Sequence, residues 1–382
     1  MKIVIAPGAF KHSLTARQAA EAIARGLRES ALAAELLLLP IADGGNGTLD
    51  AFLAAGGQRI TVKTTDALGR PLLAEIGLLP DAQTAIVEMA LASGLEKLRF
   101  GELNPLVTST GGTGLLMQAA LNSGARRIIV GMGGSATVDG GAGALAALGA
   151  QLLDAYGQPV EACGGTLGAV QSVDLSNLDP RWAQVELILA SDVRNPAVGA
   201  DGAAAVFGPQ KGAGPHEIRL LEAGLRHFLA RLAAVSGRDV LHTEGGGAAG
   251  TLAAGLMSAL GGRIESGVDL LLDHNGFDAA LTGAGLVITG EGKLDSQTLG
   301  GKGPLGAAQR ARNAGVPTVA LVGGLDAPAE ALREAGFAAV LPITPRPCAL
   351  QEALEQADAW LADSARRLGD VLAITPSRGW GQ

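Results

Sequence analysis

The sequence predicts an α/β protein made of a three-layer, Rossmann-like parallel-sheet domain with a second, mixed α/β domain inserted in it. Three observations support this prediction. Short apolar strands alternate with helices near both ends of the 382-residue chain, as is typical of parallel sheets. Beyond about residue 59, strand patterns follow one another with no helix between them. Most of the glycine-rich loops follow strands, and the length suits two or three domains.

The first elements of the chain illustrate the alternation. Residues 3–5 form a β-branched apolar run, as expected of a buried parallel strand. Thr15 and Gln18 match a capping box, which predicts that a helix begins there. Residues 36–41 indicate the next strand, and a glycine loop at 42–48 leads into another helix.

The middle of the chain differs from its ends and sets the predicted domain boundaries. Strands are predicted without intervening helices at 60–63, 72–78 and 84–89. A helix is then predicted at 113–123. Further strands are predicted at 127–131, 185–191, 286–289, 317–322 and 338–342. We therefore expect residues 1–59 and 237–382 to form the Rossmann-like domain, and residues 60–236 to form the inserted domain.

Charge and cysteine content exclude several classes of protein. The net charge is −8 and no basic run exceeds two residues, which argues against nucleic acid as a partner. Two cysteines make neither a disulfide framework nor a zinc site, so a reducing, cytoplasmic location is expected. The beginning of the chain does not have the pattern of a signal peptide. The uncharged stretch 245–262 fits a glycine loop and a buried helix rather than a membrane span. We expect no membrane association and a monomer or homodimer.

Glycine makes up about 15% of the chain, with 57 residues, and it concentrates in loops. Glycine lets backbone N–H groups converge on an anion, and a helix that follows adds the partial positive charge of its N-terminus. One such loop is most simply a tight turn, but several together favour a phosphate-binding crevice. The loops cover residues 42–48, 110–114, 131–143, 245–250 and 290–303.

Lysine is scarce, and its positions point to the same loops. The chain has seven lysines against 22 arginines. Four of the seven lie in or beside glycine-rich loops, namely Lys11, Lys211, Lys293 and Lys302. A lysine ammonium is a compact charge on a flexible stem and suits a phosphate group. Chance scatter is the alternative.

Carboxylates recur in these loops, at Asp43, Asp139, Asp192, Glu291 and Asp295. Asp192 ends a predicted strand, where open α/β sheets bind their ligands. Glu291 and Asp295 flank Lys293, and carboxylates beside phosphates are the usual way to hold Mg²⁺. For each residue alone, loop capping is the competing interpretation.

Familiar nucleotide motifs are absent. The sequence has no P-loop pattern of the form Gly-x-x-x-x-Gly-Lys-[Ser/Thr]. Residues 141–146 fit Gly-x-Gly-x-x-Ala but begin ten residues beyond the predicted strand, which argues against a dinucleotide site there. The five histidines show neither metal-ligand spacing nor a pattern with serine and aspartate.

Taken in order, the loop segments resemble the type I bacterial glycerate kinase family over nearly the whole chain, from residue 1 to about residue 372. The resemblance implies ATP-dependent phosphorylation of D-glycerate to 2-phosphoglycerate, with Mg²⁺, in a cleft of a two-domain fold. The matching segments are residues 10–15, 42–48, 88–95, 104–106, 131–143, 192–196, 207–213, 247–250 and 288–302.

The resemblance, with the loop chemistry, suggests roles for individual residues. Asp192 or Asp43 would accept the hydroxyl proton, and Lys11 is a further catalytic candidate. Glu291 and Asp295 would bind Mg²⁺ directly or through water. The phosphate- and substrate-binding candidates are Gly44, Gly45, Gly133, Gly134, Ser135, Thr137, Asp139, Lys211, Lys293 and Lys302.

The chain departs from the family pattern at a few loop positions. Gly8 and Ala9 stand where Asp-Ser is common, and Asn46 stands where Glu is common. Val138 and Thr251 replace a common Asn and Gly. Since the other carboxylates and lysines are retained, we expect an active kinase. A kinase for another small hydroxy acid and a non-catalytic ligand-binding homologue are the alternatives.

Overall fold

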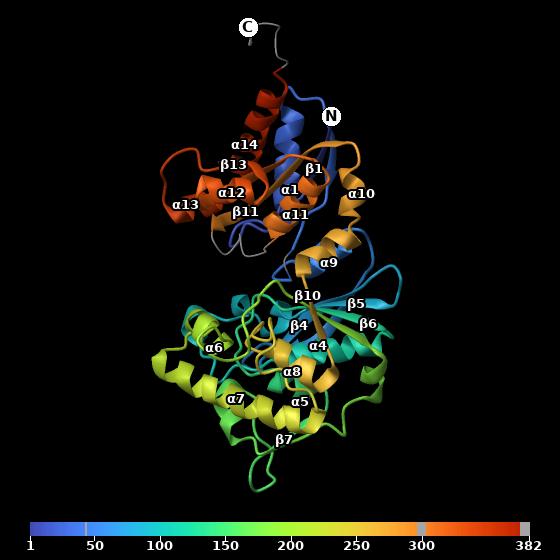
Figure 1. Cartoon of the computed structure of the whole chain (residues 1–382), viewed down its shortest axis with the longest axis vertical. Helices are drawn as coiled ribbons and strands as arrows, with labels where there is room; N and C mark the ends of the chain where they lie inside the picture. Colours follow the sequence, from blue (N-terminus) through green and yellow to red (C-terminus); the bar gives the residue numbers. More distant parts are fainter. Residues whose placement is uncertain (43, 296–302, 375–382) are drawn as a thin grey trace. The chain divides into compact units, whose positions relative to one another are not determined.

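The computed structural model describes residues 1–42, 44–295 and 303–374. Two compact units divide the chain between Asp43 and Gly44 and between Gly267 and Val268. The first unit combines both ends of the chain, so blue and red segments share it in Figure 1. The second unit is the continuous stretch Gly44–Gly267.

The elements have the following bounds. The strands are β1 Lys2–Ile5, β2 Glu35–Leu38, β3 Gln58–Thr65, β4 Pro71–Leu78, β5 Thr84–Glu88, β6 Arg127–Gly131, β7 Gln151–Leu153, β8 Ser172–Asp174, β9 Glu186–Ala190, β10 Arg263–Glu265, β11 Ala284–Asp295, β12 Thr318–Asp326 and β13 Phe337–Pro342. The α-helices are α1 Ala16–Glu29, α2 Thr48–Leu53, α3 Ala90–Ser93, α4 Gly111–Asn122, α5 Ala142–Ala147, α6 Ala203–Phe207, α7 Pro215–Ser236, α8 Leu252–Leu260, α9 Gly267–His274, α10 Phe277–Leu281, α11 Gly303–Asn313, α12 Ala329–Glu334, α13 Leu350–Glu355 and α14 Ala357–Leu372. Short 3₁₀ helices are η1 Leu95–Lys97, η2 Phe100–Glu102, η3 Gly164–Ala169, η4 Pro180–Gln184 and η5 Pro209–Lys211.

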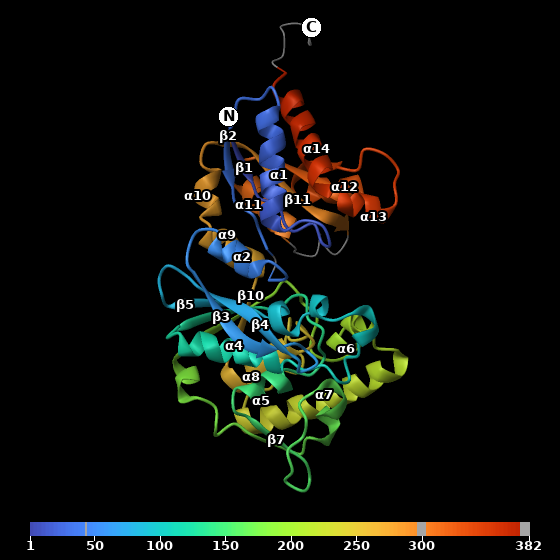
Figure 2. The same ribbon diagram turned by 180° about the vertical axis from the view of Figure 1, so that it is seen from behind.

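The first unit is a parallel sheet with helices on both faces. Its strand order is β13-β12-β11-β1-β2, and every neighbouring pair is parallel. One apolar cluster joins the sheet to α1 and α14, which lie over the face seen in Figure 2. A separate cluster joins the sheet to α11 and α12. Two cores on one sheet make three layers, so the predicted fold class is confirmed.

Helix α1 shows how local sequence builds this unit. The Thr15 hydroxyl accepts a hydrogen bond from the Gln18 amide at 3.2 Å, and Gln18 Oε1 accepts one from the Thr15 amide at 2.9 Å. This reciprocal pair is the predicted capping box, and it satisfies amides at the helix start. Ala19, Ile23 and Leu27 are then buried on one helix face.

The second unit contains a mixed sheet. Its strand order is β10-β9-β6-β5-β4-β3. The pairs from β5 to β10 are parallel, whereas β3, β4 and β5 pair antiparallel. The run of strands without helices between them is therefore confirmed as a meander. One large apolar core supports this unit.

The domain boundaries differ from those expected. The sequence pattern places residues 44–59 and 237–267 in the terminal domain, but both stretches belong to the second unit. Helix α2 packs on β4 and β5, and α8 packs on α5 and α7. Because both helices follow glycine loops in the style of a parallel domain, the sequence pattern alone cannot tell which sheet they cover.

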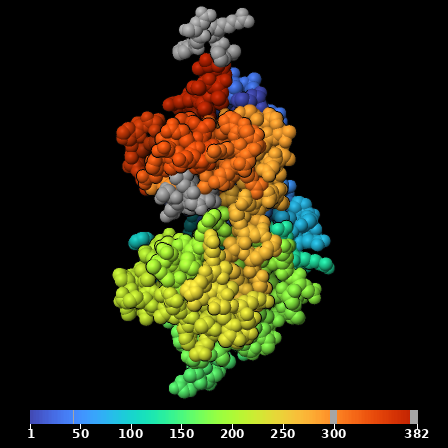
Figure 3. Space-filling model, viewed as in Figure 1, coloured from blue at the N-terminus to red at the C-terminus, as the bar shows by residue number. Residues whose placement is uncertain are grey.

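The stretch 245–262 has the form that the sequence predicts. Turns lead into α8, which is mostly buried in the second unit. Residues from about 200 to 260 form much of that unit's visible surface in Figure 3. Among the described residues, no helix combines the length and apolar character that crossing a bilayer would require.

We expect Gly26→Ala to destabilise the first unit. A Cβ at Gly26 in α1 would lie 1.9 Å from the Ala362 carbonyl oxygen of α14, so the helices must separate. Overpacking of this kind costs about 1–3 kcal/mol. Gly324→Ala is the matched control in the same unit, because its Cβ would lie 3.7 Å from the nearest atom. Urea unfolding measures both variants, and equal midpoints would contradict the prediction.

Candidate functional site

The candidate site in the second unit lies at the carboxyl ends of β5, β6 and β9, which are adjacent and parallel. The turn at residues 44–48 lies across these strand ends. The Gly44 carbonyl accepts a hydrogen bond from the Gly133 amide at 2.8 Å, just after β6. Gly44 has a φ of +82°, and a Cβ there would lie 2.3 Å from the Ala190 carbonyl oxygen at the end of β9. Only glycine permits this approach.

Glu88, the last residue of β5, holds the same turn. Its Oε1 accepts a hydrogen bond from the Gly47 amide at 3.1 Å, and its Oε2 accepts one from the Leu49 amide at 3.0 Å. The side chain is 3% exposed. Burial raises the pKa of Glu88 to about 7, although the two amide hydrogen bonds act in the opposite direction. The sequence analysis gives Glu88 no individual role, although this residue ends an apolar strand and opens the family-matching segment 88–95.

A buried lysine organises the loop that follows β6. Lys211 Nζ donates to Ser135 Oγ and to the Thr137 carbonyl oxygen, both at 2.7 Å. Lys211 is 2% exposed, and this burial lowers its pKa to about 7 against the opposing charge of Asp139. Within the described part of the chain, the buried Thr137 hydroxyl has no hydrogen-bond partner. A buried polar atom in this state is uncommon and suits a ligand contact.

Asp139 joins two glycine loops. Its carboxylate accepts hydrogen bonds from the Thr110 amide and hydroxyl at 2.7 Å each, and from the Gly141 and Gly143 amides at 3.1 and 3.2 Å. The side chain is fully buried, and burial raises its pKa. Sequence reasoning proposed a binding role, but four donors within the protein give Asp139 a scaffolding position.

Asp192 lies at the same edge, two residues beyond the end of β9. It is half-buried. The Ser191 hydroxyl accepts a hydrogen bond from the Val193 amide at 3.2 Å, which turns the chain at this point. The Asn195 carbonyl accepts one from the Gly247 amide at 2.9 Å. The loop carrying Asp192 is therefore tied to the glycine loop before α8.

The first unit contains a separate group at the ends of β1 and β11. Phe10 is buried and exchanges two backbone hydrogen bonds of 2.9 Å with Leu14, which fixes the turn that carries the exposed Lys11. A Cβ on Gly292 of β11 would lie 3.2 Å from the Lys11 amide nitrogen. This turn therefore lies against the strand that carries Glu291, Lys293 and Asp295.

Lys293 forms ion pairs with two carboxylates. Its Nζ lies 3.2 Å from Asp326 Oδ2 on β12 and 3.6 Å from Asp295 Oδ2, and these acids raise its pKa. Glu291 and Asp295 lie four residues apart on one strand and so share a side of it. Among the described residues, no three candidate ligands gather as a metal site. The pair fits Mg²⁺ only as part of a set completed by phosphates and water.

The predicted site residues thus fall into two groups. Asp43 and Lys302 lie outside the described residues. Lys11, Glu291, Lys293 and Asp295 belong to the first unit. The second unit brings together Gly44, Gly45, Gly133, Gly134, Ser135, Thr137, Asp139, Asp192 and Lys211.

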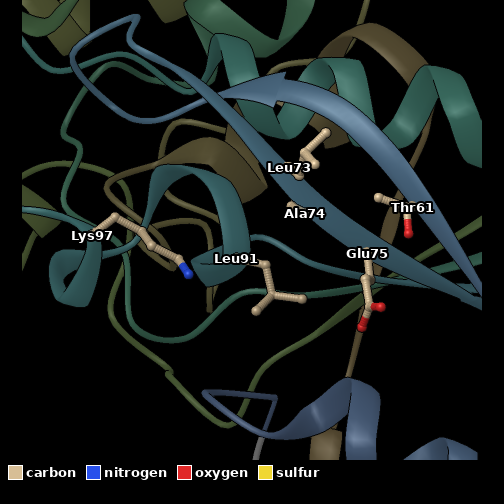
Figure 4. A pocket seen from close by; sticks show the side chains of 6 residues that line it. All are labelled: Thr61, Leu73, Ala74, Glu75, Leu91 and Lys97. Carbon is tan, nitrogen blue, oxygen red and sulfur yellow. The ribbon is translucent and has the colours of Figure 1, made fainter.

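An open hollow of about 310 Å³ lies elsewhere on the second unit, and none of the predicted site residues line it. Leu73, Ala74 and Glu75 of β4 form one wall with Thr61 of β3, and Leu91 and Lys97 contribute the rest, as Figure 4 shows. The charged residues in its lining are Glu75 and Lys97, and no glycine-rich loop of the described chain contributes to it.

The fold and the loop cluster describe an α/β protein whose loops gather at parallel strand ends, as in the class that binds small anionic ligands there. The model of the glycerate kinase family matches residues 3–373. The glycerate kinase of Bacillus subtilis (strain 168) is 43% identical over 98% of both chains. The glycerate 2-kinase of Escherichia coli (strain K12) is 41% identical, again over 98% of both.

A solved structure agrees with these matches. A crystal structure described as a glycerate kinase 2 from Salmonella typhimurium LT2 superposes with a TM-score of 0.83 and 42% identity. The match covers 97% of this chain and 98% of that chain. The chain therefore belongs to the glycerate kinase family, and it is a kinase.

Gly133→Ala is expected to disrupt the turn over the strand ends. A Cβ there would lie 2.4 Å from Gly45 Cα and 3.0 Å from its amide nitrogen, so the backbone must move. We expect kcat/KM to fall by about tenfold or more, since small displacements of a site cost rate strongly. Gly168→Ala, with open space around its Cβ, should leave kcat/KM unchanged. Steady-state kinetics test the pair, and full activity of Gly133→Ala would refute the expectation.

The burial of Lys211 predicts a pH dependence of stability. Its folded pKa of about 7 lies below the usual lysine value of 10.5, so between these values the unfolded chain binds one more proton than the folded chain. The contribution of Lys211 to the free energy of unfolding therefore rises with pH above about 7 and is lost below it. Lys211→Met should lose this rise, whereas the exposed Lys97→Met should keep it. Urea titrations at several pH values decide, and parallel curves for all three proteins would rule it out.

Proposed function

We propose that this protein catalyses the ATP-dependent phosphorylation of D-glycerate to 2-phosphoglycerate, assisted by Mg²⁺. Family membership supports a glycerate-directed kinase, and the Escherichia coli relative named as a glycerate 2-kinase supports the position of the phosphoryl group. The structural observation that carries the proposal is the cluster at the ends of β5, β6 and β9. There, glycine turns approach one another at backbone distance beside a buried ammonium group.

The cluster has the chemistry that an anionic reactant needs. Backbone amides and side-chain hydroxyls can donate hydrogen bonds to carboxylate or phosphate oxygens. The glycines of these turns leave the amides uncovered by side chains. Ser135 Oγ accepts from Lys211, which leaves its own proton for a ligand. The buried Thr137 hydroxyl is placed in the same loop. We assign these groups to binding the anionic reactant, with Lys211 holding them in position.

Asp192 is our candidate for the group that accepts the proton of the attacking hydroxyl. It is half-buried at the end of β9, beside the cluster. Asp43, the other candidate, lies outside the described residues. Phosphoryl transfer depends mainly on positioning and charge neutralisation, and a carboxylate placed here would orient the attacking hydroxyl and accept its proton.

We assign the first unit's carboxylates to the metal. Glu291 and Asp295 fit a partial Mg²⁺ shell, directly or through water, and Lys11 projects from the neighbouring turn as a candidate phosphate contact. When bound, Mg²⁺ would neutralise the charge on the nucleotide phosphates. Lys293 is available to a phosphate only if it leaves Asp326, because the two form an ion pair.

Asn46 bears on the choice of acceptor. The amide oxygen of Asn46 lies beside Gly134, where a Cβ would be only 2.1 Å away. A neutral side chain here replaces the acid that is common in the family, so repulsion of an anionic substrate is reduced. Because this change applies equally to every anionic hydroxy acid, another small hydroxy acid stays the alternative acceptor. As in the sequence analysis, we propose small-molecule partners, a cytoplasmic location and a monomer or homodimer.

ADP release coupled to an absorbance change tests the function directly. The chain is assayed with ATP, Mg²⁺ and a panel of small hydroxy acids that includes D- and L-glycerate. We expect D-glycerate to give the highest kcat/KM, and ³¹P NMR to identify 2-phosphoglycerate rather than 3-phosphoglycerate. A higher kcat/KM for another hydroxy acid would change the substrate, and no turnover with any acceptor would refute the kinase function.

Asp192→Asn tests the proposed base. We expect kcat to fall by about 10²-fold or more, the usual size of a general-base effect. Asp201→Asn is the matched control, since Asp201 is an exposed acid in the same loop. Its kcat should stay within about twofold of wild type. Unchanged turnover in Asp192→Asn would remove Asp192 from the mechanism.

A further inference from the structure

Glu88 is a buried acid that, among the described residues, accepts hydrogen bonds from one turn of the candidate site. The 44–48 turn leads into α2, and the Gly47 N-cap of this helix has no side-chain cap. The Glu88 carboxylate supplies the acceptors instead, one oxygen for the Gly47 amide and one for the Leu49 amide. Two charge-assisted hydrogen bonds to backbone fix the start of α2 on the end of β5.

The turn that Glu88 holds is also locked against the other two strand ends. The Gly44 carbonyl accepts from the Gly133 amide, and a Cβ on Gly133 would strike Gly45. Asn46 lies against Gly134. A shift of the turn away from Glu88 would therefore move the groups that line the loop after β6.

We propose that Glu88 is a positioning residue for the reaction: its ionised carboxylate holds the 44–48 turn in the binding conformation, and its protonation releases the turn. This proposal rests on the proposed kinase function. A protonated carboxyl has one oxygen that donates rather than accepts, so one of the two amides loses its acceptor. The backbone between residues 44 and 49 is then free to shift.

The surroundings of Glu88 place its titration in a useful range. Burial first, and then the negative charges of Asp50 on α2 and Glu96 on η1, raise its pKa to about 7 against the two amide hydrogen bonds. Because the folded pKa exceeds the usual glutamate value of 4.5, the contribution of Glu88 to the stability of the folded state is fully present below pH 4.5. This contribution is lost as the pH rises through about 7.

Activity and stability should therefore respond to acid in opposite directions. Below about pH 7, protonation of Glu88 should lower kcat/KM while its contribution to folding increases. A residue with a purely structural role would not give opposite pH responses of activity and stability. Acid unfolding would instead reduce activity and stability together.

The test compares pH profiles of wild type, Glu88→Gln and Glu96→Gln, with D-glycerate, ATP and Mg²⁺. Wild type should lose kcat/KM along a one-proton limb near pH 7. Glu88→Gln should lose that limb and have about tenfold lower kcat/KM at pH 8, because an amide cannot accept through both of its ends. A limb caused by titration of the ATP phosphate would be the same in all three proteins, so it is distinguished from a limb caused by Glu88.

Glu96→Gln keeps the hydrogen bonds and removes a charge that raises the pKa of Glu88. Glu96 is exposed on η1, and its substitution should move the acidic limb to lower pH. This shift decides the matter even if Glu88→Gln fails to fold. An unmoved limb in Glu96→Gln, or a wild-type limb in Glu88→Gln, would overturn the proposal.

Amide hydrogen exchange separates this proposal from the proposed function. Protection of the Gly47 and Leu49 amides, corrected for intrinsic exchange, should fall in Glu88→Gln and in wild type below about pH 7. If protection follows Glu88 but no acceptor is phosphorylated at any pH, only the kinase function fails. If turnover occurs while protection is independent of Glu88, the positioning role is wrong.

Discussion

The candidate site depends on backbone segments that approach too closely for any side chain to lie between them. At Gly44, Gly133 and Gly250 an added Cβ would lie 1.9–2.4 Å from another segment's backbone. These contacts bring turns from distant parts of the sequence to the ends of three neighbouring strands. The amides and hydroxyls of the site are consequently positioned by main chain and require no long flexible side chains.

Close backbone packing also explains the unusual electrostatics. Lys211, Asp139 and Glu88 are all buried beneath these turns, and each is held by hydrogen bonds to loop atoms. Burial moves the pKa of Lys211 and of Glu88 towards neutrality from opposite sides. Small changes of pH near 7 therefore alter charges under the site. In our proposal the charged groups act mainly by fixing loops, while contacts with the reactants are assigned to amides, hydroxyls and Asp192.

The two units carry different kinds of polar groups. The second unit has neutral donors over buried charges, whereas the first presents partly exposed carboxylates with Lys11 and Lys293. Glu291 and Asp295 suit a hydrated metal ion that accompanies phosphate groups. Departures from the family pattern at Asn46 and Thr251 fall in the second unit. Asp192 and Lys211 are retained in the same unit.

The sequence by itself determined the alternating elements, the capping box of α1 and the loops that carry the site, because these depend on local periodicity and glycine placement. It also pointed to Lys211 and Asp192, and the family resemblance was confirmed. It did not place α2 and α8 in the second unit, and it did not show the four hydrogen bonds that Asp139 accepts within the protein. Only the tertiary structure decided these, and only it exposed the role of Glu88. Burial and hydrogen-bond partners arise from residues distant in the chain, which no local pattern encodes.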